Sequence, residues 1–235
     1  MTDEAYRQLP RYSNSDLLEL SRVMLPTFEK NKPIDPKTAL FGTFFHAMIL
    51  EPEKELDWSL IHVKERYKLM QMVENFVKSV DEFTLDCIKQ GKSEVVKLWD
   101  CPITGLPLKA KLDNVFAGTN LPIQGPLIID LKTTSYRNPQ DFYDSIIKYG
   151  YDRQAAFYLD SLGIERNYNF RFVCVQKNSP FTVFEINLAL SADRKKIVDE
   201  GRKKNAFWLR KAAEEAKKPN GWKPSSWSRK PELVA

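Results

Sequence analysis

Two acidic residues and a lysine lie at the ends of apolar segments whose composition is typical of β-strands. Asp113 lies in the segment that begins at Leu106, and Asp130 and Lys132 lie in the segment that begins at Pro126. Side chains alternate between the two faces of a strand, so Asp130 and Lys132 share a face. If the two strands pair, two carboxylates and an ammonium group converge. Two carboxylates can hold a hard divalent cation, and a lysine beside it suits the hydrolysis of a phosphodiester bond.

The first of these segments carries a simple alternation pattern. We expect one polar and one apolar face: Lys109, Lys111 and Asp113 against Leu108, Ala110 and Leu112. An alternative interpretation is that each acid simply begins a loop. This suits Asp113 better than Asp130, because Asp130 lies between apolar residues.

A histidine, His46, lies within an apolar segment whose hydrophobic residues recur at helical spacing up to Leu50. His46 is off the apolar stripe, and Gly42, one turn earlier, leaves space beside the imidazole. The imidazole could ligate a metal ion, or it could be a satisfied residue of a buried helix. The dipeptide at 51–52, Glu-Pro, is predicted to end the helix.

A polar pair, Gln154 and Tyr158, is spaced four residues apart in a segment that is predicted to be helical, so the two side chains share a face. They could position a phosphate or a catalytic side chain, or they could face solvent. Arg153, beside them, could contact a phosphate or be solvated.

Glu94 opens a strand-like segment that precedes Asp113 in the chain. It could be a third acid near a metal ion. It could equally form an ion pair with Lys109 or Lys111 across a hairpin.

Composition indicates one globular domain of ordinary type. The chain has 235 residues, of which 29% are charged and 43% hydrophobic, enough to bury a substantial core. The N-terminus is polar and acidic, so no secretory signal is expected, and the apolar stretch 39–50 is too short to span a bilayer. Three cysteines without CxxC spacing predict neither a zinc site nor a disulfide framework, which favours a reducing cytoplasm.

Positive charge is concentrated near the C-terminus. The net charge is +5, but residues 192–230 carry 13 Lys and Arg against 5 Asp and Glu, a net charge of +8. This segment could bind phosphates, or it could be the solvated face of an amphipathic helix. Beyond it, a tail that contains Trp222 and Trp227 could pack against a neighbouring subunit.

Helical patterns occur before and after a run of strand-like segments. Strands are expected at 94–99, 106–116, 126–134, 169–176 and 181–188, with helices at 40–50, within 62–90, at 142–147 and 152–162, and from 191 onward. This order predicts an α/β fold in which a central mixed β-sheet is flanked by helices on both faces. We expect a single domain over 1–235, with an N-terminal helix and loop (1–36), a core (37–190) and a basic C-terminal helix and tail (191–235).

The order of these motifs resembles the PD-(D/E)xK nuclease superfamily. More narrowly, it is similar to RecE-type exonucleases (exodeoxyribonuclease VIII-like), which are relatives of the RecB nuclease domain and lambda exonuclease. The resemblance runs from about Leu40 to Tyr158 and rests on four motifs: the helix of His46 with its Leu-Glu-Pro ending, Asp113, Asp130-Leu-Lys132, and the Gln-Ala-Ala-Phe-Tyr helix. One departure is that Lys-Leu, rather than a proline, precedes Asp113.

The resemblance implies a restriction-endonuclease-like core and roles for these positions. His46, Asp113, Asp130 and the main-chain carbonyl of Leu131 would ligate Mg²⁺, with Mn²⁺ as a substitute. Lys132 would be the catalytic lysine, Gln154 and Tyr158 would match the motif that follows it, and Glu94 would match an acid of some relatives. Relatives with an iron–sulfur cluster need four cysteines, so no cluster is expected.

The resemblance also implies an activity: a metal-dependent exonuclease that digests linear double-stranded DNA from 5′ to 3′ and leaves single-stranded overhangs for homologous recombination and DNA repair. The implied partners are DNA ends, a single-strand annealing recombinase and further copies of the chain in a ring. No membrane partner is expected, and the implied setting is the cytoplasm of a bacterium, with a bacterial or phage gene. Three alternatives stay open: an endonuclease or flap nuclease, a non-catalytic scaffold that binds DNA ends, and a coincidental pattern in a generic α/β protein.

Overall fold

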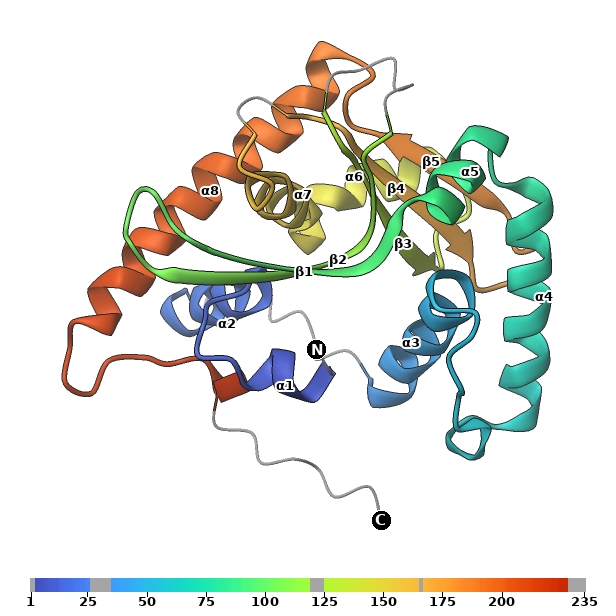
Figure 1. The fold of residues 1–235 in the computed structure, drawn as a ribbon, viewed down its shortest axis with the longest axis horizontal. Coiled ribbons are helices and arrows are strands. Elements are labelled where there is room, and N and C mark those ends of the chain that lie inside the picture. Colours follow the sequence, from blue (N-terminus) through green and yellow to red (C-terminus); the bar gives the residue numbers. More distant parts are fainter. Residues whose placement is uncertain (1–2, 26–34, 119–124, 165–166, 228–235) are drawn as a thin grey trace.

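A five-stranded mixed sheet forms the centre of the molecule (Figure 1). The computed structural model describes residues 3–25, 35–118, 125–164 and 167–227. The strands are β1 (Lys92–Asp100), β2 (Pro107–Phe116), β3 (Leu127–Thr134), β4 (Phe170–Gln176) and β5 (Val183–Asn187), in the order β1-β2-β3-β4-β5. Only β3 and β4 pair in parallel, and the other neighbours are antiparallel.

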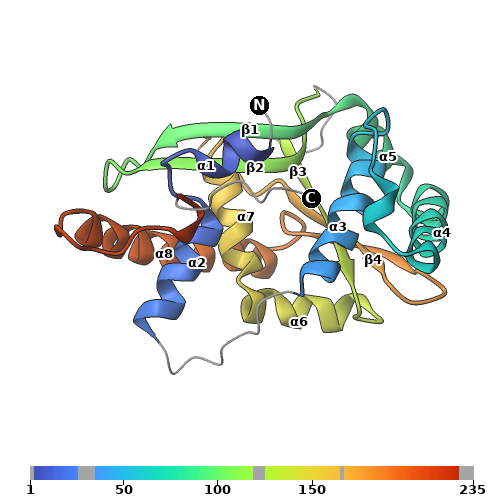
Figure 2. The ribbon, with the colours of Figure 1, turned by 90° about the horizontal axis from the view of Figure 1, so that it is seen from below.

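Helices cover both faces of this sheet, which confirms the predicted α/β class (Figures 1 and 2). One face carries α3 (Pro36–Leu50), α4 (Val63–Ser79) and α5 (Glu82–Gln90). The other carries α2 (Asn14–Met24), α6 (Pro139–Tyr149), α7 (Tyr151–Asp160) and α8 (Ala192–Ala216). A short helix, α1 (Asp3–Gln8), and the 3₁₀ turns Trp58–Leu60 and Ser225–Trp227 complete the described elements.

The helices that carry site residues begin and end on clear local signals. α3 begins with Pro36 after Asp35, whose carboxylate accepts the N–H of Thr38 at 3.2 Å. α6 ends at Gly150, whose φ of 71° is left-handed backbone that favours glycine. α7 starts directly after the same residue, so one glycine makes the turn between two helices.

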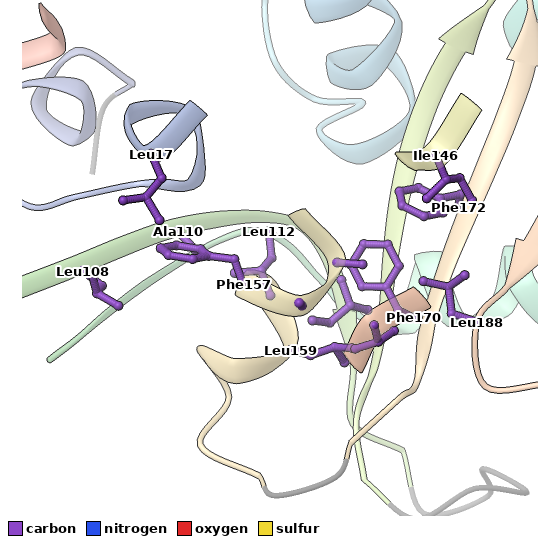
Figure 3. Close-up of a cluster of buried hydrophobic side chains, with 14 of the residues drawn as sticks. Leu17, Leu108, Ala110, Leu112, Ile146, Phe157, Leu159, Phe170, Phe172 and Leu188 are labelled. Carbon is purple, nitrogen blue, oxygen red and sulfur yellow. The ribbon is translucent and has the colours of Figure 1, made fainter. Parts of the chain in front are cut away.

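The core between α7 and the sheet is dense and apolar (Figure 3). Ala155 and Ala156 let α7 lie close to the strands, and Phe157 and Leu159 project from it into the cluster that Figure 3 shows. Helix α8 packs on α7 at Gly201, where a Cβ atom would overlap the carbonyl oxygen of Asp152. This close approach fixes α7, and with it Gln154, against the sheet.

The simple alternation predicted for β2 holds as far as Leu112 and then changes. Leu112 joins the core on the α7 side, whereas Phe116, which has the same parity, packs on the α3 side. The change falls where Asp113 and Glu94 leave the β1–β2 ladder, and Glu94 has a φ of 54°. Positive φ is uncommon outside glycine, and it marks the same point on the neighbouring strand β1.

Both ends of the described chain meet on the same side of the molecule. The rings of Trp222 and Trp227 pack on Tyr12, with centroids 6.3 and 5.0 Å away, and the Trp227 indole donates to the Arg11 carbonyl. These tryptophans therefore have contacts within the chain, and the expectation that they pack on a neighbouring subunit stays a prediction. Residues 228–235 of the tail lie outside the described residues.

The cysteines and the apolar helices were also the subject of expectations from the sequence. The three cysteines are free and buried. No helix within the described ranges combines the length and apolar character needed to cross a membrane.

Candidate active site

The pairing of β2 and β3 stops one residue before the two acids. The last paired residues at this end are Asn114 and Ile129, so Asp113 and Asp130 lie opposite each other just beyond the ladder. Asp113 Oδ2 accepts the N–H of Leu131 at 2.9 Å, in the place of a strand-to-strand bond. The strands are thus joined here through a side chain, which leaves the carboxylates at the point where they separate.

His46 approaches the same carboxylate from α3. Its Nδ1 lies 3.4 Å from Asp113 Oδ2, and it has a backbone hydrogen bond with Leu131. Burial, together with the positive charge of Lys132, lowers the pKa of His46 to about 4. The imidazole is therefore neutral at neutral pH and keeps a lone pair available for a ligand.

Asp130 is held on the α7 side of the sheet. Its Oδ1 accepts the amide of Gln154 at 3.0 Å, and its Oδ2 pairs with Lys132 Nζ. The Lys132 ammonium also lies 5.0 Å from the ring centroid of Tyr151. Gln154 and Tyr158 share the face of α7 that the four-residue spacing predicted, and Tyr158 has a side-chain hydrogen bond with Gln154.

Burial and mutual charge perturb the titration of this cluster. Burial raises the pKa of Asp113 and of Asp130 to about 6 in spite of the nearby Lys132. Burial would lower the pKa of Lys132, but the two carboxylates outweigh it and raise that pKa, so the ammonium stays charged. Burial and the same carboxylates raise the pKa of Tyr158, which stays a neutral phenol.

A cavity of about 260 Å³ opens onto His46 and Asp113. Its other lining residues come from α1, α3, the segment after α3, and the β1–β2 hairpin: Tyr6, Arg7, Thr43, Ala47, Glu51, Lys54, Glu94 and Lys111. We call it the catalytic pocket. Two ion pairs lie in its wall, Glu51 with Lys54 at 2.7 Å and Glu94 with Lys111.

The structure shows where Glu94 and Arg153 lie, for which the sequence left alternatives open. Glu94 pairs with Lys111 and not with Lys109, and it lines the catalytic pocket. Arg153 does not reach this pocket, because it points from α7 towards α8, where its Nε donates to Asn205 at 3.1 Å. The side chain of Arg153 therefore lies apart from that of Gln154, and its contact with a phosphate stays a prediction.

The contribution of α1 to the pocket was missed from sequence. Tyr6 and Arg7 reach the pocket because Lys109, which is 2% exposed, donates to the carbonyls of Tyr6, Arg7 and Leu9 at 2.8–3.1 Å. A buried lysine that holds the end of a six-residue helix leaves no periodic signal. The one signal in the sequence is a lysine inside an apolar strand, which needs buried hydrogen-bond acceptors.

The site contains the types of donor atom that bind a hard divalent cation. They are carboxylate oxygens, a neutral imidazole and a main-chain carbonyl. The N–H and C=O groups of a strand residue point the same way, so the Leu131 carbonyl faces Asp113 and His46 as its N–H does. Within the described ranges, however, no three His, Cys, Asp or Glu side chains are grouped as a ready metal site. Lys132 and Gln154 engage the carboxylate of Asp130.

A mixed sheet with opposed acids and a lysine at its strand ends defines the PD-(D/E)xK class of folds. The chain belongs to the family described as "PDDEXK-like domain of unknown function (DUF3799)", whose model matches residues 22–211. Helix α1, with Tyr6 and Arg7, precedes the matched residues, although it forms part of the pocket wall.

A solved structure has a similar fold. It is described as a "Putative exonuclease" from Eubacterium rectale, and it aligns with a TM-score of 0.56 and 13% identity over 91% of this chain and 86% of that chain. A second, described as SSO0001, aligns at a TM-score of 0.33 and 15% identity over 88% of this chain and 96% of that chain, too low for any argument. None of the curated proteins compared with the chain matches it.

Proposed function

We propose that the chain is a metal-dependent deoxyribonuclease that hydrolyses phosphodiester bonds at the ends of linear double-stranded DNA. The observation that carries the proposal is the convergence of His46, Asp113, Asp130 and Lys132 at the end of the β2–β3 ladder. Family membership and a neighbour described as a "Putative exonuclease" support the nuclease class. The preference for ends and a role in recombination rest on the sequence resemblance alone.

Each residue has a definite task in this proposal. Asp113, Asp130, neutral His46 and the Leu131 carbonyl would hold Mg²⁺ or Mn²⁺. A bound cation would lower the pKa of a water molecule and neutralise charge on the scissile phosphate.

The side chains around these ligands would stabilise the transition state and position the ligands. Lys132, charged at neutral pH, donates to a phosphate oxygen and stabilises the negative charge of the transition state. Gln154 holds Asp130 in position through its amide, and Tyr158 in turn supports Gln154. Both act as positioning residues.

The test is a cleavage assay on duplex DNA that is labelled at either its 5′ or its 3′ termini. Linear duplex is incubated with the protein and Mg²⁺ or Mn²⁺, and a covalently closed circle of the same sequence serves as the control. We expect digestion of the linear DNA, an intact circle and no reaction in EDTA. Release of label from the 5′ end first would support 5′-to-3′ polarity.

Two other results would change the proposal. Cleavage of the closed circle would identify an endonuclease on the same fold. Binding to DNA ends without cleavage in either metal would identify a scaffold and refute the enzymatic proposal.

A further inference from the structure

A second hollow lies beyond the turn between α6 and α7. It has a volume of about 840 Å³ and is bounded by the end of α2, by the 147–150 turn and by the middle of α8. Its lining includes Arg22, Lys148, Tyr149, Arg153 and Phe207. We call it the tyrosine groove. The nuclease proposal gives it no role.

The tyrosine groove has a clear excess of positive charge. Its lining residues include five Lys and Arg but one acid, Asp152, which Lys204 already engages at 2.5 Å. Arg153 is only 6% exposed, and its Nη2 finds no partner among the residues that the structure describes. Asp152 is a counter-charge beside Arg153, but burying the unpaired Nη2 donor is costly, so this lining favours a ligand with several negative charges.

Aromatic surface accompanies these charges. Tyr149 is 39% exposed and Phe207 is 48% exposed, and the Phe207 ring lies 5.0 Å from that of Trp208. Alternating cations and exposed rings are the features by which proteins hold single-stranded nucleic acid, since phosphates meet the cations and bases stack on the rings. Bases inside a duplex already stack on one another and leave no free face for a tyrosine.

A row of tyrosines connects the groove to the catalytic lysine. The ring of Tyr149 lies 5.9 Å from Tyr151, whose ring lies 5.0 Å from Lys132 Nζ. The hydroxyls of Tyr149 and Tyr136 are also hydrogen-bonded at 3.3 Å. The single ring of Tyr151, which also packs on Phe142 and Phe172, therefore separates Tyr149 at the groove from Lys132.

We propose that the tyrosine groove binds an unpaired segment of the DNA strand that continues from the scissile phosphate. The phosphates of this segment contact the lysines and arginines of the groove, and its bases stack on Tyr149 and Phe207. This inference rests on the proposed function for the identity of the ligand. A protein partner is the less favoured occupant, because five cations against one acid would need an unusually acidic surface.

Binding of fluorescein-labelled oligo(dT) to the full chain, followed by anisotropy in EDTA and again in Ca²⁺, tests the groove without cleavage. Tyr149→Ala should weaken binding about tenfold, and Tyr149→Phe, which keeps the ring, should bind like the wild type. Tyr67→Ala is the matched aromatic control, because Tyr67 is 67% exposed on α4. A melting curve for each variant shows that it is folded.

A second experiment tests the positive charge of the groove with two comparable lysines of α8. Lys203 pairs with Glu200 and Lys196 with Asp193, both at i,i+3, and their side chains are 71% and 74% exposed. Only Lys203 lines the groove. Lys203→Ala should reduce the slope of log affinity against log salt by about 0.7, and Lys196→Ala should leave it unchanged.

Three results overturn the inference. One is wild-type affinity of Tyr149→Ala in both buffers, and another is an equal loss of salt slope in both lysine variants. The third is a change in oligomeric state by light scattering in Tyr149→Ala with unaltered oligo(dT) affinity, which would identify a protein interface. The two proposals fail separately: groove-dependent binding by a chain that cleaves nothing refutes the nuclease alone, and cleavage without groove-dependent binding refutes the groove alone.

Discussion

The catalytic pocket and the tyrosine groove differ in how their charges are balanced. The pocket is lined by three cations, Arg7, Lys54 and Lys111, and by three acids, Glu51, Glu94 and Asp113. Lys132 and Asp130, beside it, pair with each other. The groove instead carries five cations against one acid.

This difference indicates that the two regions bind phosphates in different ways. The groove can attract phosphates with its excess positive charge, whereas the charges that line the pocket balance and its carboxylates repel phosphates. A cation held by the carboxylates, as proposed, would offset this repulsion. The charge balance therefore supports metal dependence of the pocket and simple electrostatic binding in the groove.

The largest expected effect separates chemistry from binding. Lys132→Ala should reduce the rate of cleavage about 10²–10³-fold, because the variant loses the charge that stabilises the transition state. Its affinity for oligo(dT) should stay at the wild-type value, since Lys132 does not line the groove. Steady-state cleavage and anisotropy check the two parts, with the exposed Lys92→Ala as control. Normal digestion by the variant would refute the assignment of Lys132.

Removing one carboxylate should weaken the binding of the metal ion. Asp113→Asn should weaken Mn²⁺ binding more than about tenfold, because even partners that merely support a ligand cost 10–100-fold when lost. Isothermal titration calorimetry measures this, with the exposed Asp86→Asn as the matched control. Unchanged Mn²⁺ affinity would show that Asp113 is not a ligand.

Acid should weaken the metal site with a definite midpoint. Asp113 and Asp130, with pKa values of about 6, are mostly ionised at pH 7 and mostly protonated at pH 5. Protons compete with the cation for each carboxylate, so affinity should fall as pH falls, about tenfold per carboxylate over this range. His46, with its pKa of about 4, stays neutral throughout. Affinity for Mn²⁺ that is flat between pH 5 and 7 would contradict this electrostatic description.

Tyr151 joins the two regions, so its variants should affect cleavage moderately. Tyr151→Leu removes the ring beside the Lys132 ammonium, a contact of about 0.5–2 kcal/mol, and should slow cleavage a fewfold. Tyr151→Phe keeps the ring and should cleave normally. Equal rates for all three proteins would show that the tyrosine row does not assist the catalytic lysine.

The smallest effect concerns the turn at Gly150. Alanine at a φ of 71° costs about 1 kcal/mol, which lowers the melting temperature by about 2–4 °C. Gly105, with a φ of 70° and equally open surroundings, provides a matched control at the β1–β2 turn. Gly150→Ala should also reduce oligo(dT) affinity, whereas Gly105→Ala should only destabilise. Equal oligo(dT) affinity in both variants would show that the turn at Gly150 does not contribute to binding in the tyrosine groove.

Local patterns predicted most of the site because its parts sit on regular elements. The spacing of Gln154 and Tyr158 on a helix, and the positions of Asp130 and Lys132 on a strand, follow from periodicity alone. His46 was expected to lie off the apolar stripe of its helix, and it does face Asp113. These side chains converge as predicted, and their roles as ligands stay predictions.

Features that depend on contacts far apart in the chain could not be predicted. Lys109 holds α1 through three carbonyls about a hundred residues earlier in the sequence, and no local rule encodes such a pairing. The change of alternation at Asp113 lies opposite Glu94, whose positive φ is an uncommon conformation for that residue type. Arg153 adjoins Gln154 in the sequence, but its side chain points towards α8, where it donates to Asn205, and no local rule predicts that contact.

The bond from the Leu131 amide to Asp113 gives the site a built-in reporter. Amide protons of a central strand normally exchange slowly because a neighbouring strand holds them, but this one depends on a side chain. Whenever the Asp113 carboxylate turns away, the Leu131 amide loses its acceptor while the neighbouring ladder bonds remain. Its hydrogen–deuterium exchange rate, compared with that of Ile129 on the same strand, therefore follows the carboxylate itself, with no substrate, label or substitution in the site.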